Sequence, residues 1–202
     1  MKKLSTIILS TLIVATLLYS SEINKGSFLG LKFGSDLKTY SKLLKPLPSE
    51  YDARMSCEKY EIIGKICTID NELNYETKHR VIQDKRIKSI LLYFNDKNKL
   101  FYIKVLTPVL YYFAKYKQAG DATFNKYYKF LKSLPVKNAK KCYIWKPDTL
   151  IMGKSYDHTT YQLTKSVSNK KMQDEFDKKV KLAKQKAKKL DKKKIENLKV
   201  SF

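Results

Sequence analysis

The segment that decides the fold reads IKSILLYF at residues 87–94, NDKNK at 95–99 and LFYIKVLT at 100–107. Its two outer runs are rich in β-branched and aromatic residues and are joined by a short polar linker, which predicts a β-hairpin. Because side chains alternate between the two faces of a strand, each run carries one apolar face. These faces consist of Ile90, Leu92 and Phe94 in the first run and of Phe101, Ile103 and Val105 in the second. Pairing them predicts a continuous apolar surface that another layer must cover.

The opposite face of this hairpin is only half polar. It carries Leu91, Tyr93, Leu100, Tyr102 and Lys104. We therefore expect two central strands, with something packed over part of this second side as well.

The residues before the hairpin add a helix and further strands. Residues 28–33 predict a short strand that ends at a glycine turn, and Ser35 caps a helix whose apolar side is Leu37, Tyr40 and Leu44. Residues 58–69 are rich in residues that favour strands, with a tight turn or a bulge at Gly64. Residues 71–83 fit a strand with one solvent-exposed face. Together they predict an antiparallel sheet of about four strands, covered on one side by the helix.

The second half of the chain repeats this order of elements. Thr107 and Pro108 begin a short helix over 109–118, Gly120 breaks it, and Asp121 caps a second helix that ends before Pro135. The apolar stripe of the second helix is Phe124, Tyr127, Tyr128 and Leu131. Strand-like segments follow at 142–146, 149–153 and 156–167. A helix followed by strands therefore occurs twice, without any repeat at the level of residues.

The two ends of the chain differ from its middle. Residues 1–21 have Lys2 and Lys3, an apolar run and then Ser20 and Ser21, which is typical of a cleaved secretory signal peptide. An uncleaved anchor is the alternative, but the run is shorter than about 18 residues. Residues 169–202 carry thirteen Lys and five acidic residues. This tail predicts one helix over 169–198 with a thin stripe formed by Phe176, Val180, Ala183, Ala187 and Leu190.

These features predict an α+β fold with one or two antiparallel sheets, helices packed on one face and a long basic C-terminal helix. The expected organisation is a signal peptide at 1–21, a first module at 22–107, a second module or a continuation of the same domain at 108–168, and the Lys-rich tail at 169–202. A formal charge of +23 points to an anionic partner, although a low-GC genome produces the same lysine-rich composition. We expect the tail either to bind an anionic surface or to serve as a solvated helix that aids solubility.

Export makes the three cysteines candidates for a disulfide. Cys57 and Cys67 are close in sequence and form the preferred pair, with Cys142 buried or paired elsewhere. Three unpaired cysteines are the alternative. No metal site and no cofactor are expected, because the chain has two histidines and neither lies at a ligand spacing from the cysteines.

Two groups of residues are candidates for function. His158 beside Asp157 is a weak catalytic candidate, because neighbours on a strand point to opposite faces and Asp157 is then poorly placed to orient the imidazole. The aromatic residues Tyr143, Trp145, Tyr156 and Tyr161 lie among lysines. They predict a stacking or protein-binding face, with core packing as the alternative. Sequence-specific nucleic-acid binding is not expected.

The segment FLGLKFGSDLKTYSKLL at residues 28–44 follows the signal peptide as strand, glycine and capped helix. With the antiparallel strands after it and the recurring order of helix and strands, the chain resembles the β-lactamase-inhibitor-protein-like group of small bacterial envelope proteins. That group includes the small lipoprotein of the outer-membrane barrel assembly machinery, whose lipid-bearing cysteine is absent here. The resemblance implies helices on one side of an antiparallel sheet and protein binding without catalysis. It transfers no individual binding residue.

The sequence therefore predicts an exported, non-enzymatic binding or structural protein of the bacterial cell envelope, found in the periplasm or secreted. Its expected partner is an envelope protein or an anionic membrane surface. The alternatives are an envelope hydrolase that uses His158, and a secreted surface-binding factor or toxin. The oligomeric state stays open.

Overall fold

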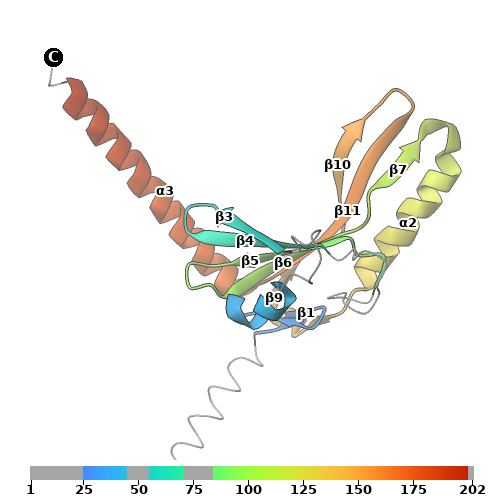
Figure 1. Cartoon of the computed structure of the whole chain (residues 1–202), viewed down its shortest axis with the longest axis horizontal. Helices are drawn as coiled ribbons and strands as arrows, with labels where there is room; N and C mark the ends of the chain where they lie inside the picture. The colour runs from blue at the N-terminus through green and yellow to red at the C-terminus, as the bar shows by residue number, and fades with distance from the viewer. Residues whose placement is uncertain (1–24, 45–54, 71–83, 200–202) are drawn as a thin grey trace, which may run out of the picture.

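The computed structural model describes residues 25–44, 55–70 and 84–199, and its fold is α+β as expected (Figure 1). Most strands belong to one antiparallel sheet of eight strands. They are β3 (Met55–Tyr60), β4 (Gly64–Asp70), β5 (Ser89–Phe94), β6 (Leu100–Leu106), β7 (Leu110–Phe113), β9 (Cys142–Ile144), β10 (Asp148–Lys154) and β11 (His158–Asn169). The order is β10-β11-β6-β5-β4-β3, with β7 and β9 also paired to β11. The segments predicted at 1–21 and 71–83 lie outside the described residues.

The central hairpin formed by β5 and β6 confirms the predicted pairing with one correction. Ile90 pairs with Val105 and Leu92 with Ile103, but the register then shifts so that Phe94 pairs with Leu100. The shift is a β-bulge, which leaves Phe101 as an extra residue. Phe101 therefore lies on the opposite face, where its ring centroid is 4.6 Å from that of Phe176. Leu100 takes its place in the main hydrophobic core.

The long strand β11 holds the two halves of the chain in one sheet. Along one edge it pairs with β6 and then β7, and along the other with β9 and then β10. Proline stands at both interruptions, at Pro108 and Pro147, because it has no N–H to donate to the ladder. Thr107 bridges the first interruption: its backbone N–H donates to Leu163 O at 2.9 Å, and its Oγ1 accepts from Leu163 N at 3.0 Å. The predicted second module is thus a continuation of the same sheet.

We call the side that carries Ile90, Leu92 and Phe94 the first face of the sheet. It is covered by a small sheet of β1 (Ser27–Phe28), β2 (Leu31–Lys32) and β8 (Val136–Lys137), by the 3-10 helix η1 (Leu37–Leu44) and by α2 (Lys117–Ser133). Where one short strand was expected, β1 and β2 form a hairpin. Its two turn residues, Leu29 and Gly30, both have positive φ, of 54° and 80°. This is the geometry of a tight hairpin turn, which favours glycine.

The prediction of a helix over 109–118 is wrong. Residues Leu110–Phe113 form β7, whose alternating side chains pair with β11, and α2 begins only at Lys117. Gly120 does not break α2 but lies inside it, and Asp121 follows within the helix rather than capping it. A Cβ at Gly120 would lie 2.6 Å from the Tyr112 ring. Glycine is therefore required there by the close approach of β7 to α2.

The second face of the sheet is covered in part by α3 (Lys170–Lys199), which then projects away from the body (Figure 1). Phe176 and Val180 are buried against Phe101. Gly64 leaves space for this contact, because a Cβ there would lie 2.9 Å from the Phe176 ring. Of the predicted stripe, Ala187 and Leu190 are exposed. Docking is therefore limited to the first turns of α3.

The structure joins Cys57 and Cys67, which face each other across β3 and β4, in a disulfide. This is the pair preferred from the sequence. Cys142 is a free, buried thiol, and burial raises its pKa. Burial of this kind makes it inert rather than reactive.

A pH prediction follows from three tyrosines near the contact of α3 with the sheet. Burial raises the pKa of Tyr60, Tyr93 and Tyr102 above the usual 10.0. Above that pH the unfolded chain loses protons that the folded chain keeps, so the free energy of unfolding falls as pH rises. Burial lowers the pKa of Lys165, which has the opposite effect, but one lysine opposes three tyrosines.

We expect tyrosinate absorbance of the folded protein to rise in two steps. The second step should coincide with loss of the circular dichroism signal at alkaline pH. The urea-denatured chain, as a control, should titrate in one step near the usual tyrosine pKa. A single step in the folded protein, with no change in circular dichroism, would contradict the prediction.

Candidate binding site on the open sheet face

Among the described residues, no element covers the second face between α3 and the hairpin of β10 and β11 (Figure 1). Aromatic side chains lie there in two separate groups. Tyr102, Tyr143 and Trp145 form the first group, which we call the aromatic face, and Tyr111 and Phe113 form the second group beside His158. All but Tyr102 are among the exposed large hydrophobic side chains, with Tyr111 56% and Trp145 43% exposed. Exposed aromatic groups of this kind mark interaction surfaces more often than isolated exposed residues do.

The centre of the aromatic face is Trp145, the one tryptophan in the chain. Its ring centroid lies 5.6 Å from that of Tyr102 and 6.0 Å from that of Tyr143. Both tyrosines are held in place, because Tyr102 donates to Ser166 Oγ at 2.7 Å and Tyr143 donates to Asp174 Oδ1 on α3 at 3.1 Å. The cluster is therefore positioned by β6, β9, β11 and α3 together.

Trp145 stands in the interruption between β9 and β10, and a hollow lies on each side of it. The larger, of about 630 Å³, is on the second face and includes Tyr102, Lys104, Lys146 and Asp148 in its wall. The smaller, of about 230 Å³, lies toward α2. Its wall consists of Tyr128, Lys132, Ile144, Trp145, Lys146, Pro147 and Lys165.

Lys165 is the most unusual charged residue of the site, since only 4% of it is exposed. Its Nζ donates to the carbonyl oxygens of Lys132 and Leu134, at 3.3 and 3.1 Å, at the C-terminal end of α2. A cation suits this end of a helix, where carbonyl groups lack partners. Within the described part of the chain, no carboxylate forms an ion pair with it. The burial of Lys165 could not be predicted from the sequence, because an isolated lysine in a strand gives no local signal of burial.

The four aromatic residues predicted from the sequence have three different environments. Tyr143 and Trp145 come together on the aromatic face as predicted. Tyr161 does not, because strand alternation places it on the first face, 4% exposed and 6.2 Å from the Phe124 ring of α2. Its surface role is therefore wrong, and the alternative of core packing holds. Tyr156 is fully exposed at the turn between β10 and β11, outside the cluster.

Tyr111 and Phe113 were missed as surface residues because their segment was predicted as a helix. The available signal was the alternation of Leu110, Tyr111, Tyr112 and Phe113 directly after a proline. This pattern puts Tyr111 and Phe113 on one face and Leu110 and Tyr112 on the other, facing the core.

The expectation that Asp157 is poorly placed to orient His158 is wrong. Asp157 lies in the bend before β11, and His158 Nδ1 donates to its Oδ1 at 2.7 Å. This hydrogen bond lowers the pKa of Asp157. An oriented imidazole can act as a base, but His158 rests against Tyr111 and Phe113 and lines neither hollow beside Trp145. The geometry brings no nucleophile to it among the described residues.

Three further findings bear on function. Residues 25–44, 55–70 and 84–199 contain no group of three or more side chains suited to hold a metal ion. Within the same ranges, no helix combines the length and apolar character that a membrane span requires. The chain matches no family model, no curated protein and no solved structure.

Proposed function

We propose that this protein is an exported, non-enzymatic binding protein of the bacterial cell envelope that holds a protein partner on the aromatic face. The observation that carries the proposal is the cluster of Tyr102, Tyr143 and Trp145. The rings of Tyr143 and Trp145 are exposed and rest beside the half-buried Tyr102, while hydrogen bonds hold the two tyrosines in place. Tryptophan and tyrosine are enriched among the residues that dominate binding energy, and a preorganised cluster loses little entropy on binding.

Export is supported by the signal-like residues 1–21 and by the Cys57–Cys67 disulfide, since disulfides persist in oxidising compartments. A non-enzymatic role is supported by the position of His158, which rests against Tyr111 and Phe113 and lines neither hollow beside Trp145. The resemblance of residues 28–44 to small envelope proteins that bind other proteins points the same way.

A second candidate function is binding of an anionic surface through α3. Its support is the projecting half of the helix, where Lys186, Lys188, Lys189 and Lys192 are exposed and Asp191 is the one acidic residue between Lys178 and Lys194. The two functions use different surfaces of the protein and are tested separately.

The partner on the aromatic face is tested by comparing three purified proteins as baits for crosslinking in envelope extracts. These are the unaltered protein, Trp145→Ala and Tyr156→Ala. Truncation of a central aromatic residue costs about 2–4 kcal/mol of binding energy, which lowers affinity about 30- to 1,000-fold. A true partner is therefore lost with Trp145→Ala and retained with Tyr156→Ala, which removes an even more exposed aromatic residue that lies outside the cluster.

The affinity of the purified partner for each variant gives the quantitative readout. If every captured protein is retained equally by Trp145→Ala and Tyr156→Ala, the aromatic face is not the binding surface. Circular dichroism of both variants controls for folding, which should be unchanged because both side chains are exposed.

A further inference from the structure

We infer that the smaller hollow beside Trp145 receives one anionic group, a carboxylate or a phosphate, carried by the partner that lies on the aromatic face. The inference deepens the proposed function, and it rests on that function for the identity of the carrier. The hollow itself is defined by three elements that meet at the interruption between β9 and β10. They are the C-terminal part of α2, residues 145–147 and β11.

The charges around the smaller hollow have one sign. Lys132, Lys146 and Lys165 contribute to its wall, and none of the wall residues is acidic. The larger hollow differs, because Asp148 is part of its wall along with Lys104 and Lys146. Three cations around about 230 Å³ create a positive potential that an anion relieves. The space accommodates one compact group, such as a carboxylate or a phosphate, rather than a large ligand.

The smaller hollow differs from a group of surface lysines because one of its three lysines, Lys165, is buried. An ammonium group has three N–H donors, and two of those of Lys165 go to the carbonyl oxygens of Lys132 and Leu134. The third has no hydrogen-bond acceptor among the described residues, and on that side Nζ has only the ring of Phe28, whose centroid lies 5.6 Å away. Burying a charge without an opposite charge is unfavourable, and burial lowers the pKa of Lys165 accordingly. An anion in the hollow supplies both the missing acceptor and the missing charge.

The position of the hollow links it to the aromatic face. Trp145 belongs to the walls of both hollows, so a partner segment that stacks on its ring can place an acidic group on the other side of it. Charge-assisted hydrogen bonds of this kind are about twice as strong as neutral ones. The partner segment is therefore expected to carry an anionic group next to an apolar or aromatic one.

The single indole N–H signal of Trp145 reports binding directly in ¹H–¹⁵N correlation spectra of the full chain. The protein is titrated with inorganic phosphate and, separately, with succinate, against sodium chloride at equal ionic strength. We expect a saturable shift with phosphate or succinate and none with chloride, with dissociation constants in the millimolar range. The anion that binds more tightly identifies the preferred chemistry.

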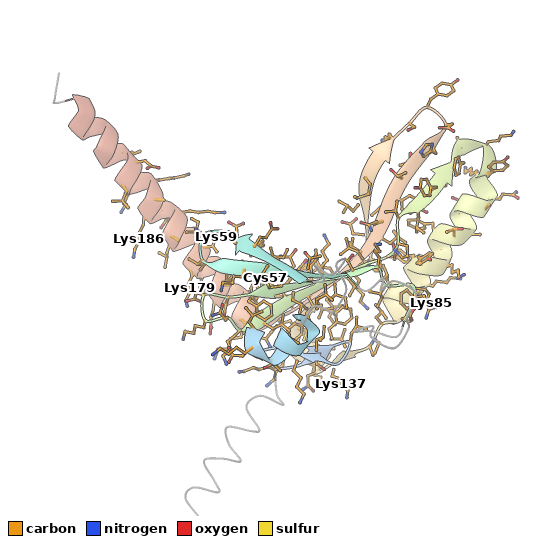
Figure 2. All side chains as sticks on the ribbon, viewed as in Figure 1. Cys57, Lys59, Lys85, Lys137, Lys179 and Lys186 are labelled. Atoms are coloured by element: carbon orange, nitrogen blue, oxygen red, sulfur yellow. A yellow bond between two sulfur atoms is a disulfide. The ribbon has the colours of Figure 1, made fainter. Side chains whose placement is uncertain are left out.

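The variant Lys132→Gln with Lys146→Gln removes two of the three cations. Both side chains are exposed, so folding should be unaffected. Each lysine is expected to contribute about tenfold in affinity, which corresponds to about 1.4 kcal/mol. The matched control, Lys59→Gln with Lys137→Gln, removes the same charge at positions outside both hollows (Figure 2). It should bind as the unaltered protein does.

A shift that does not saturate, or an equal loss of affinity in both double variants, would overturn the inference and leave only a general effect of net charge. This result is distinguishable from failure of the proposed function. Small anions test the hollow without any partner, whereas the Trp145→Ala comparison tests the aromatic face with the partner present.

Discussion

Replacing Lys186, Lys188, Lys189 and Lys192 together by glutamine should lower the affinity of the protein for anionic vesicles by about a thousandfold. Each lysine near an anionic lipid surface contributes about 1 kcal/mol, and about 1.4 kcal/mol corresponds to a factor of ten. All four side chains are exposed on the part of α3 that projects from the body, and Lys186 is visible there in Figure 2. The body of the protein therefore does not sterically prevent these lysines from reaching a membrane surface.

The measurement is sedimentation with vesicles that contain phosphatidylserine, at low and at high salt. Binding of the unaltered protein should weaken as salt rises, because the Debye length falls from about 10 Å at 0.1 M to about 3 Å at 1 M. A matched variant replaces Lys59, Lys85, Lys126 and Lys137, which are exposed elsewhere on the protein. It should lose much less affinity. Equal losses in the two variants, or binding that salt does not change, would make α3 a solvated helix without a membrane role.

The helical state of this projecting segment has a local explanation. Lysines dominate the later turns of α3, where they suit the negative end of the helix dipole, whereas its first turn holds Lys170 and Lys171 and no acidic residue. Two ion pairs join α3 to the sheet, Lys179 with Asp96 and Lys184 with Glu61, each at 2.6 Å. Exposed pairs of this type contribute little stability. The main anchor of α3 must therefore be apolar.

The second large effect is expected for Phe176→Ala, which should lower the free energy of unfolding by about 3–5 kcal/mol. Phe176 is 3% exposed, and its ring centroid lies 4.6 Å from that of Phe101 and 5.8 Å from that of Tyr60. Truncation removes this packing and leaves a cavity against Gly64, which has no side chain to fill it. The loss is a large share of the stability of a domain, about 5–15 kcal/mol.

Urea unfolding followed by circular dichroism measures this loss as a shift of the midpoint. Leu190→Ala is the matched control, since Leu190 is on the same helix but 60% exposed. Its effect should stay within about 0.5 kcal/mol. Similar midpoints for the two variants would mean that α3 is not held by the Phe176 contact. A tail that leaves the body in Phe176→Ala should also become the first site of proteolysis, because undocked helices open locally.

The sequence by itself determined the elements whose patterns are local. The alternation in 87–107 predicted the central hairpin and the apolar face that Ile90, Leu92, Ile103 and Val105 share, because the period of a strand can be seen in consecutive residues. The composition of the tail stripe indicated that the tail docks only in part, because two of its five members are alanines and each buries little apolar area. The joint position of Tyr143 and Trp145 was also predictable, because both lie in one short strand-like segment.

Only the tertiary structure decided which faces are covered and where the alternation breaks. The bulge places Phe101 against Phe176, a residue distant in sequence. Residues 110–113 form a strand because β11 offers them a partner, which overrides the helical interpretation of the segment. Tyr161 and Lys165 lie on one strand among similar neighbours, and both are buried because α2 packs over them. Burial depends on which elements pack against each other in the folded chain, and a local pattern in a single sequence does not show which ones do.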